Sequence, residues 1–149
     1  MDKKELPVLI RMLSAECDPL GHEENTMRLL LPGTLTRRPD GWLLSYTETL
    51  EEDGGRPVTH EVRVLAREDR VTVLRKGPYG MMMVLQHDVP YQGTYHTPYG
   101  DMAMDVIATR LQTELGEDRG SIRMEYQLRV GGSEAMIRRM SYEYAPRQC

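Results

Sequence analysis

The chain has 149 residues and a formal net charge of −4, and its acidic and basic residues are interspersed rather than grouped in blocks. This length suits one domain, and the charge pattern argues against a protein that binds nucleic acid electrostatically. The first apolar run is interrupted by Arg11 and is too short for a signal or membrane segment, so we expect a cytoplasmic protein without membrane contact.

Runs of alternating apolar and polar residues follow one another along the chain, separated by segments rich in glycine, proline, asparagine and aspartate. Alternation with a period of two predicts half-buried strands, and these polar segments predict turns. Before residue 90, the sequence predicts strands at 8–13, 27–35, 42–49, 58–66, 71–75 and 81–85. We find no helical pattern in this part of the chain.

The stretch 91–109 predicts two strands that meet at a corner. The odd-numbered residues of 91–97 share one face, and from Met102 onward the even-numbered residues do. Pro98 has no N–H for a sheet, so Thr97-Pro98-Tyr99-Gly100 is expected to turn the chain, with Tyr99 packing the corner. Residues 109–115 either continue the strand or form a turn of helix.

Two further strands are predicted after this stretch, at 121–130 and 136–144, which makes about ten strand segments in all. Short antiparallel strands at roughly ten-residue intervals suit a sandwich or an up-and-down barrel, and a barrel removes exposed edges. We therefore predict an all-β fold: a single antiparallel β-barrel of about eight to ten strands that spans residues 1–149. No repeat or linker indicates a second domain.

Several short motifs, taken in their order and spacing, also resemble a known family. They are Gly33, Gly41-Trp42, Ser45-Tyr46-Thr47-Glu48, Arg75-Lys76-Gly77 at the end of 71–77, Met83-Val84-Leu85, Tyr95-His96-Thr97-Pro98-Tyr99-Gly100 followed by Met102, Met104 and Thr109, and Gly120 leading to Tyr126. The chain resembles the YwiB-like family, small bacterial proteins that form a domain of unknown function. The resemblance implies a lipocalin-like (calycin) β-barrel with an internal cavity, and it brings no established substrate or catalytic residue.

Three residues depart from the family pattern. Leu85 stands where phenylalanine is usual, His96 where an acidic residue is common, and Pro32 where a polar strand residue is usual. These departures put in doubt any site that needs an aromatic side chain at position 85 or an acid at position 96.

Two charged residues are predicted to face the barrel interior. Glu48 and Arg75 each alternate in step with apolar neighbours, and an arginine–carboxylate pair is the usual way in which an inward charge is tolerated. We expect the two side chains to meet inside the barrel. The two charges then either only neutralise each other, or lie at a mouth of the barrel, or anchor the polar part of a ligand.

Methionine and tyrosine side chains are predicted to face the same space. With the charged pair they form the candidate ligand site, which consists of Tyr46, Glu48, Arg75, Met83, Tyr95, Met102, Met104, Met124 and Tyr126. A barrel of about eight strands is just wide enough to be filled by side chains or to hold one small molecule. The set therefore fits either a ligand pocket or a packed core.

No motif for a metal site, a cofactor or covalent catalysis is present in the sequence. Cys17 and Cys149 are not part of a CxxC motif, and no GxSxG, P-loop or dinucleotide fingerprint appears. The histidines lack HxH and HExxH spacing; they are His22, His60, His87 and His96. We therefore predict no metal, no cofactor and no catalytic residues.

The function predicted from the sequence is binding of a small apolar or amphipathic ligand inside a cytoplasmic barrel without evident enzymatic machinery. One alternative is a structural or protein-interaction barrel with a filled core that acts as a homodimer. A third reading is an enzyme that uses Glu48 and a tyrosine as acid–base partners. The fold does not choose among these three.

Overall fold

The computed structural model describes residues 5–18, 20–51 and 55–147, and these residues form strands and turns without a helix. The prediction of an all-β fold is therefore confirmed. The strands are β1 (Glu5–Cys17), β2 (Glu23–Arg38), β3 (Gly41–Glu51), β4 (Pro57–Ala66), β5 (Val71–Lys76), β6 (Met81–Leu85), β7 (Pro90–Thr97), β8 (Gly100–Glu114), β9 (Gly120–Val130) and β10 (Met136–Pro146).

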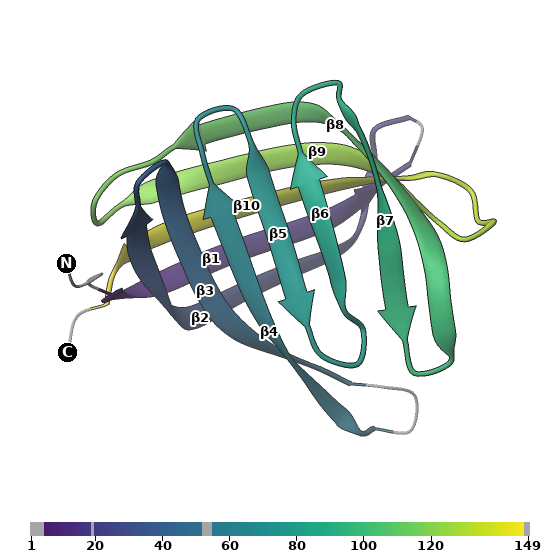
Figure 1. Cartoon of the computed structure of the whole chain (residues 1–149), viewed down its shortest axis with the longest axis horizontal. Coiled ribbons are helices and arrows are strands. Elements are labelled where there is room, and N and C mark those ends of the chain that lie inside the picture. The colour runs from purple at the N-terminus through teal and green to yellow at the C-terminus, as the bar shows by residue number, and fades with distance from the viewer. Residues whose placement is uncertain (1–4, 19, 52–54, 148–149) are drawn as a thin grey trace.

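The strands form a closed antiparallel barrel in which each strand pairs with its neighbours in sequence (Figure 1). Closure comes from β1, which pairs with β2 on one side and with β10 on the other. The predicted barrel is confirmed, with ten strands. The pairing between β6 and β7 is the shortest in the barrel. Among the described residues, these two strands share one register pair, Met81–Tyr95.

Residues 109–115 mostly continue strand β8 and do not form a turn of helix. Thr109 is an extra residue between the pairs that Ala108 and Arg110 make with β9, so the strand contains a β-bulge there. The bulge moves the inward face from even-numbered residues such as Val106 to odd-numbered residues such as Leu111. One long strand can therefore bend around the barrel without losing its apolar face.

The corner at Thr97-Pro98-Tyr99-Gly100 is present, but Tyr99 does not pack it, because this residue is 90% exposed. That expectation was wrong. The Thr97 side chain holds the turn instead: its hydroxyl donates to the carbonyl of Gly100 (2.7 Å) and accepts from the backbone N–H of Tyr99 (3.1 Å). A short side chain that bonds to the backbone can fix a turn without covering it.

The barrel interior is a packed apolar core at the end where β8 turns into β9. Ala66, Val71 and Leu85 are terminal residues of their strands, yet each is at most 1% exposed. The β8–β9 turn is fixed at this end, because the hydroxyl of Tyr144 donates to the carbonyl of Gly116 (2.9 Å) and accepts from its N–H (3.0 Å). We call this the closed end.

The other end of the barrel is less covered because β2 and β3 separate there. Their pairing runs from Arg38–Gly41 to Gly33–Tyr46 and goes no further among the described residues. The preceding part of β2 pairs with β1 alone, and Pro32, the last residue of that part, has no N–H for a ladder. We call this the open end. In Figure 1 it lies toward the right, where β7 turns into β8 and β9 leads into β10.

Candidate functional site

Apolar side chains on the inward face remain partly exposed at the open end. Met27 and Met102 are 38% and 39% exposed, although each continues the inward face of its strand. Other inward-facing apolar residues of this end are half-buried; they are Leu29, Leu31, Met81, Tyr95, Leu128, Val130 and Met136. Solvent therefore reaches an apolar surface inside the rim of the barrel.

Arg75 and Glu48 meet at this open end. Nη1 of Arg75 donates to Oε1 of Glu48 at 3.4 Å, and the two side chains are 16% and 10% exposed. Nη2 of Arg75 donates to the hydroxyl of Tyr95 (3.3 Å), and Nε donates to the carbonyl of Tyr79 (2.8 Å). The predicted contact between Glu48 and Arg75 is thus present, and the backbone bond is the shortest of the three.

His60 lies beside this pair and is fully buried. It is the register partner of Glu48 across strands β3 and β4. Its Nε2 accepts the backbone N–H of Tyr79 (3.1 Å), so the ring proton of the neutral imidazole is on Nδ1, which has no hydrogen-bond partner among the described residues. Burial, and then the charge of Arg75, lower the pKa of His60, so the ring is neutral at pH 7.

Two tyrosine hydroxyls meet deeper in the barrel. The hydroxyls of Tyr46 and Tyr142 are 3.0 Å apart, and the Tyr46 hydroxyl also lies 3.6 Å from the sulfur of Met12. Burial raises the pKa of Tyr46 to about 12 and raises that of Tyr142 well above its usual value. Both phenols are therefore protonated at neutral pH and serve as hydrogen-bonding groups.

A second arginine–glutamate pair lies on the opposite wall. Nη2 of Arg138 on β10 donates to Oε1 of Glu16 on β1 at 3.4 Å, while Nε of Arg138 is buried without a partner among the described residues. Burial raises the pKa of Tyr126, and the charges of Arg138 and Arg75 act in the opposite direction. The pKa of Tyr126 thus depends on the charges of both guanidinium groups.

The candidate residues predicted from the sequence divide into three groups. Four belong to the packed core at 1–2% exposure; they are Met83, Met104, Met124 and Tyr126. Glu48, Arg75 and Tyr95 form the polar cluster, with Tyr46 bonded to Tyr142 just below it. Met102 lies at the rim. A role for any of these residues in ligand binding remains a prediction.

Several residues at the open end were not among the candidates predicted from the sequence. Tyr142 contacts Tyr46, and Arg138 pairs with Glu16. His60 was considered only as a metal ligand, although it alternates with Val62 and Val64 on a strand that follows the Glu48 strand in a hairpin. That pattern could have placed His60 beside Glu48.

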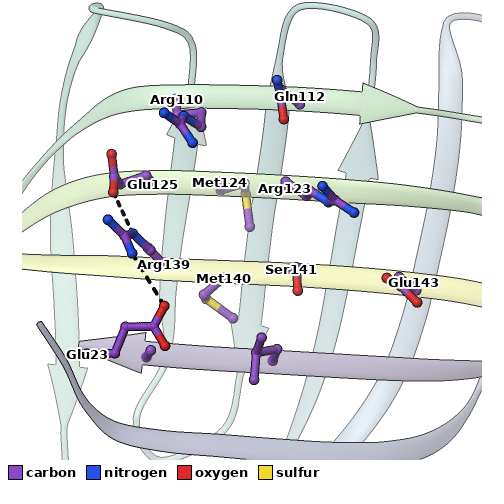
Figure 2. Close-up of a pocket in the computed structure, with 12 residues that line it drawn as sticks. Glu23, Arg110, Gln112, Arg123, Met124, Glu125, Arg139, Met140, Ser141 and Glu143 are labelled. Carbon is purple, nitrogen blue, oxygen red and sulfur yellow. Dashed lines mark hydrogen bonds and ion pairs between the residues drawn. The ribbon is translucent and has the colours of Figure 1, made fainter. Parts of the chain in front are cut away.

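A hollow of about 350 Å³ also lies on the outer face of β8, β9, β10 and β1, as Figure 2 shows. The charged side chains that line it are of both signs. Arg139 bridges Glu125 and Glu23, at 2.7 and 3.4 Å respectively. Because its arginines are already paired or lie among carboxylates, this hollow does not present a charge of one sign to a ligand.

Within the part of the chain that the structure describes, no group of three or more histidine, cysteine, aspartate or glutamate side chains could hold a metal ion. No helix in the same residues is long and apolar enough to cross a membrane. His96, where the family commonly has an acid, points outward, and its Nδ1 lies 2.9 Å from Oδ1 of Asp101. The departure at that position is therefore outside the polar cluster.

Fold and site together define a closed ten-stranded antiparallel β-barrel with two arginine–glutamate pairs at its open end. The family model described as "Domain of unknown function (DUF1934)" matches residues 13–141, and the chain belongs to this family. No curated protein matches the chain.

Two solved structures match the chain. The crystal structure of the ywiB protein from Bacillus subtilis has a TM-score of 0.79 and 24% sequence identity, and the alignment covers 98% of this chain and 96% of that one. A structure of unknown function from Bacteroides ovatus has a TM-score of 0.37 and 12% identity, over 96% of this chain and 41% of that one. The first match shows a shared fold and nothing further, and the TM-score of the second is too low to indicate a shared fold.

Proposed function

We propose that this protein binds a small amphipathic ligand at the open end of the barrel. The polar part of the ligand lies at Arg75, and its apolar part lies against the inward-facing residues that are partly exposed there. One observation carries this proposal: Met27 and Met102 are 38% and 39% exposed on the inward face of a barrel whose other end is packed. Ligand sites are concave and mostly apolar, with a few convergent polar groups.

Methionine is well represented around this end. Met27, Met81, Met102 and Met136 all lie on the inward face and are exposed or half-buried. Their unbranched, polarizable side chains can adapt to ligands of different shape. The packed core beneath them limits the ligand to the open end, so we place it at the rim and not in the centre of the barrel.

The test is native mass spectrometry of the protein purified from cell extract under non-denaturing conditions. A retained small molecule should appear as added mass that is lost after denaturation. The Met102→Glu variant should lose this mass, because it places a charge in the apolar part of the site. Met82→Glu is the matched control. Met82 is 43% exposed and lies on the outward face of β6.

If the Met102→Glu variant retains the mass as fully as Met82→Glu does, the ligand is not at the open end. If the wild-type protein has no added mass and titration with single-chain amphiphiles changes no open-end resonance in its NMR spectrum, the proposed function is wrong. The native mass spectra also report the mass of the assembled protein, and a stable dimer without ligand would support the protein-interaction alternative.

A further inference from the structure

We infer that the polar part of this ligand is an oxyanion that binds Arg75, and that Glu48 then turns from Arg75 to His60. This inference rests on the proposed function, because it concerns the ligand of the same site. It assigns a chemical class to the ligand and a second position to the Glu48 side chain.

Arg75 is held in place without help from Glu48. Its Nε donates to the carbonyl of Tyr79 at 2.8 Å, which fixes the guanidinium plane, and the guanidinium carbon lies 5.8 Å from the centre of the Tyr95 ring. The contact to Glu48 is a single hydrogen bond of 3.4 Å. Charge-assisted bonds between arginine and carboxylate are commonly shorter, at roughly 2.7–2.9 Å, and often bidentate. Glu48 therefore balances the charge of Arg75 but occupies little of its donor capacity.

His60 offers Glu48 another partner. Nε2 and Cδ2 of the ring face Tyr79 and Gly77, so Nδ1, at the opposite corner, points away from the β5–β6 turn. Glu48 lies on that side, as the register partner of His60 in β3. Directly opposite residues on one face of an antiparallel pair are close enough for a glutamate side chain to reach across. Among the described residues the Nδ1–H group is a buried donor without an acceptor, and a carboxylate there would satisfy it.

When Glu48 exchanges Arg75 for His60, the site can bind an anion while the polar groups of the site stay paired. An oxyanion can take the two terminal nitrogens of Arg75 in the planar geometry that guanidinium groups favour. Glu48 meanwhile accepts from Nδ1 of His60, which stays neutral because its Nε2 accepts from Tyr79. An uncharged ligand would leave Glu48 on Arg75 and the His60 donor unsatisfied. The arrangement therefore favours carboxylate-type ligands over neutral ones.

The experiment compares three probes that share an apolar chain and differ in the head group: octanoate, octanol and octyltrimethylammonium. Each is titrated below its aggregation concentration into isotopically labelled protein, and the NMR spectrum reports the dissociation constant. We expect octanoate to bind more tightly than the other two. We also expect the His60 Nδ1–H resonance to shift downfield and exchange more slowly with octanoate alone, as it gains an acceptor.

Glu48→Gln is the decisive variant, because it keeps the shape of the side chain and removes the charge that competes with the ligand. Octanoate should bind about tenfold more tightly or better, since a like charge at short range is removed. The affinity for octanol should change much less than the affinity for octanoate. Glu61→Gln, on the outward face of β4, should leave the affinity for octanoate unaltered. In Arg75→Gln, octanoate should lose its advantage over octanol.

The outcomes separate this inference from the proposed function. If octanol or octyltrimethylammonium binds at the open end as tightly as octanoate, or if Glu48→Gln does not strengthen octanoate binding, the inference is wrong and the proposed function stands. If none of the three probes perturbs the open end, both are wrong. Should Arg75→Gln fail to fold, the Glu48→Gln comparison alone decides the question.

Discussion

The unfolding free energies lost on removing the Tyr46 hydroxyl and the Tyr142 hydroxyl singly should add up to more than the loss on removing both. In Tyr46→Phe, the hydroxyl of Tyr142 loses the group 3.0 Å away while the residue is 1% exposed, so it becomes a buried group without that partner. Such a group costs about 1–3 kcal/mol of unfolding free energy. In Tyr142→Phe, the remaining Tyr46 hydroxyl still lies 3.6 Å from the sulfur of Met12, so we expect about 0.5–1.5 kcal/mol.

The double variant replaces both hydroxyls and leaves no unpaired group. Its loss of unfolding free energy should be smaller than the sum of the two single losses by about 1 kcal/mol or more. Urea unfolding followed by the fluorescence of Trp42, the only tryptophan, measures all three values. Tyr99→Phe is the control, because its side chain is 90% exposed and should change nothing. Additive losses, within roughly 0.5 kcal/mol, would refute the coupling of the two hydroxyls.

Two further predictions concern the buried phenols and a close glycine contact. Burial raises the pKa of Tyr46 to about 12, above about 10 in an unfolded chain, so the unfolded state loses its proton first. The unfolding free energy should therefore fall as pH rises from about 10 to 12, with a smaller fall in Tyr46→Phe, and urea melts across this interval that show no fall would contradict it. In Gly120→Ala the new methyl group would meet the Tyr144 ring and the carbonyl oxygen of Glu114, 2.6 Å away, so calorimetry should show a loss of about 1–3 kcal/mol. Gly132→Ala, with nothing within 4 Å, should be neutral, and equal melting temperatures for the two variants would count against the packing at Gly120.

Most of the barrel could be predicted from alternation alone. Side chains of a strand point to opposite faces whatever the neighbouring strands are, so the pattern of 121–130 was sufficient to identify an inward face. In the structure, Ile122, Met124 and Tyr126 are buried on that face. The same rule placed Glu48 and Arg75 inside, because each is in step with apolar residues on its own strand.

Alternation could not predict where an inward face changes side. Thr109 is a bulge in β8, and β2 has an irregularity at Asn25, whose φ of 50° lies in the left-handed region. Nothing in the spacing of apolar residues marks one inserted residue in a strand. The sequence also gave no indication that Tyr99 would be exposed, since an aromatic residue beside a proline is equally compatible with a packed corner.

The position of the polar cluster and the opening of the barrel have one cause in the strand pairing. Tyr46 is the last residue of β3 that pairs with β2, and Glu48 is the next inward-facing residue along β3. It is therefore the first that β2 no longer covers. A buried charge without water or a partner is costly, so a glutamate is tolerated at this point because β2 has moved away and Arg75 reaches it from β5. Pro32 and Gly33, which end the ladder on β2, thus determine where the barrel can hold charge, and the candidate ligand site follows from the place at which two strands separate.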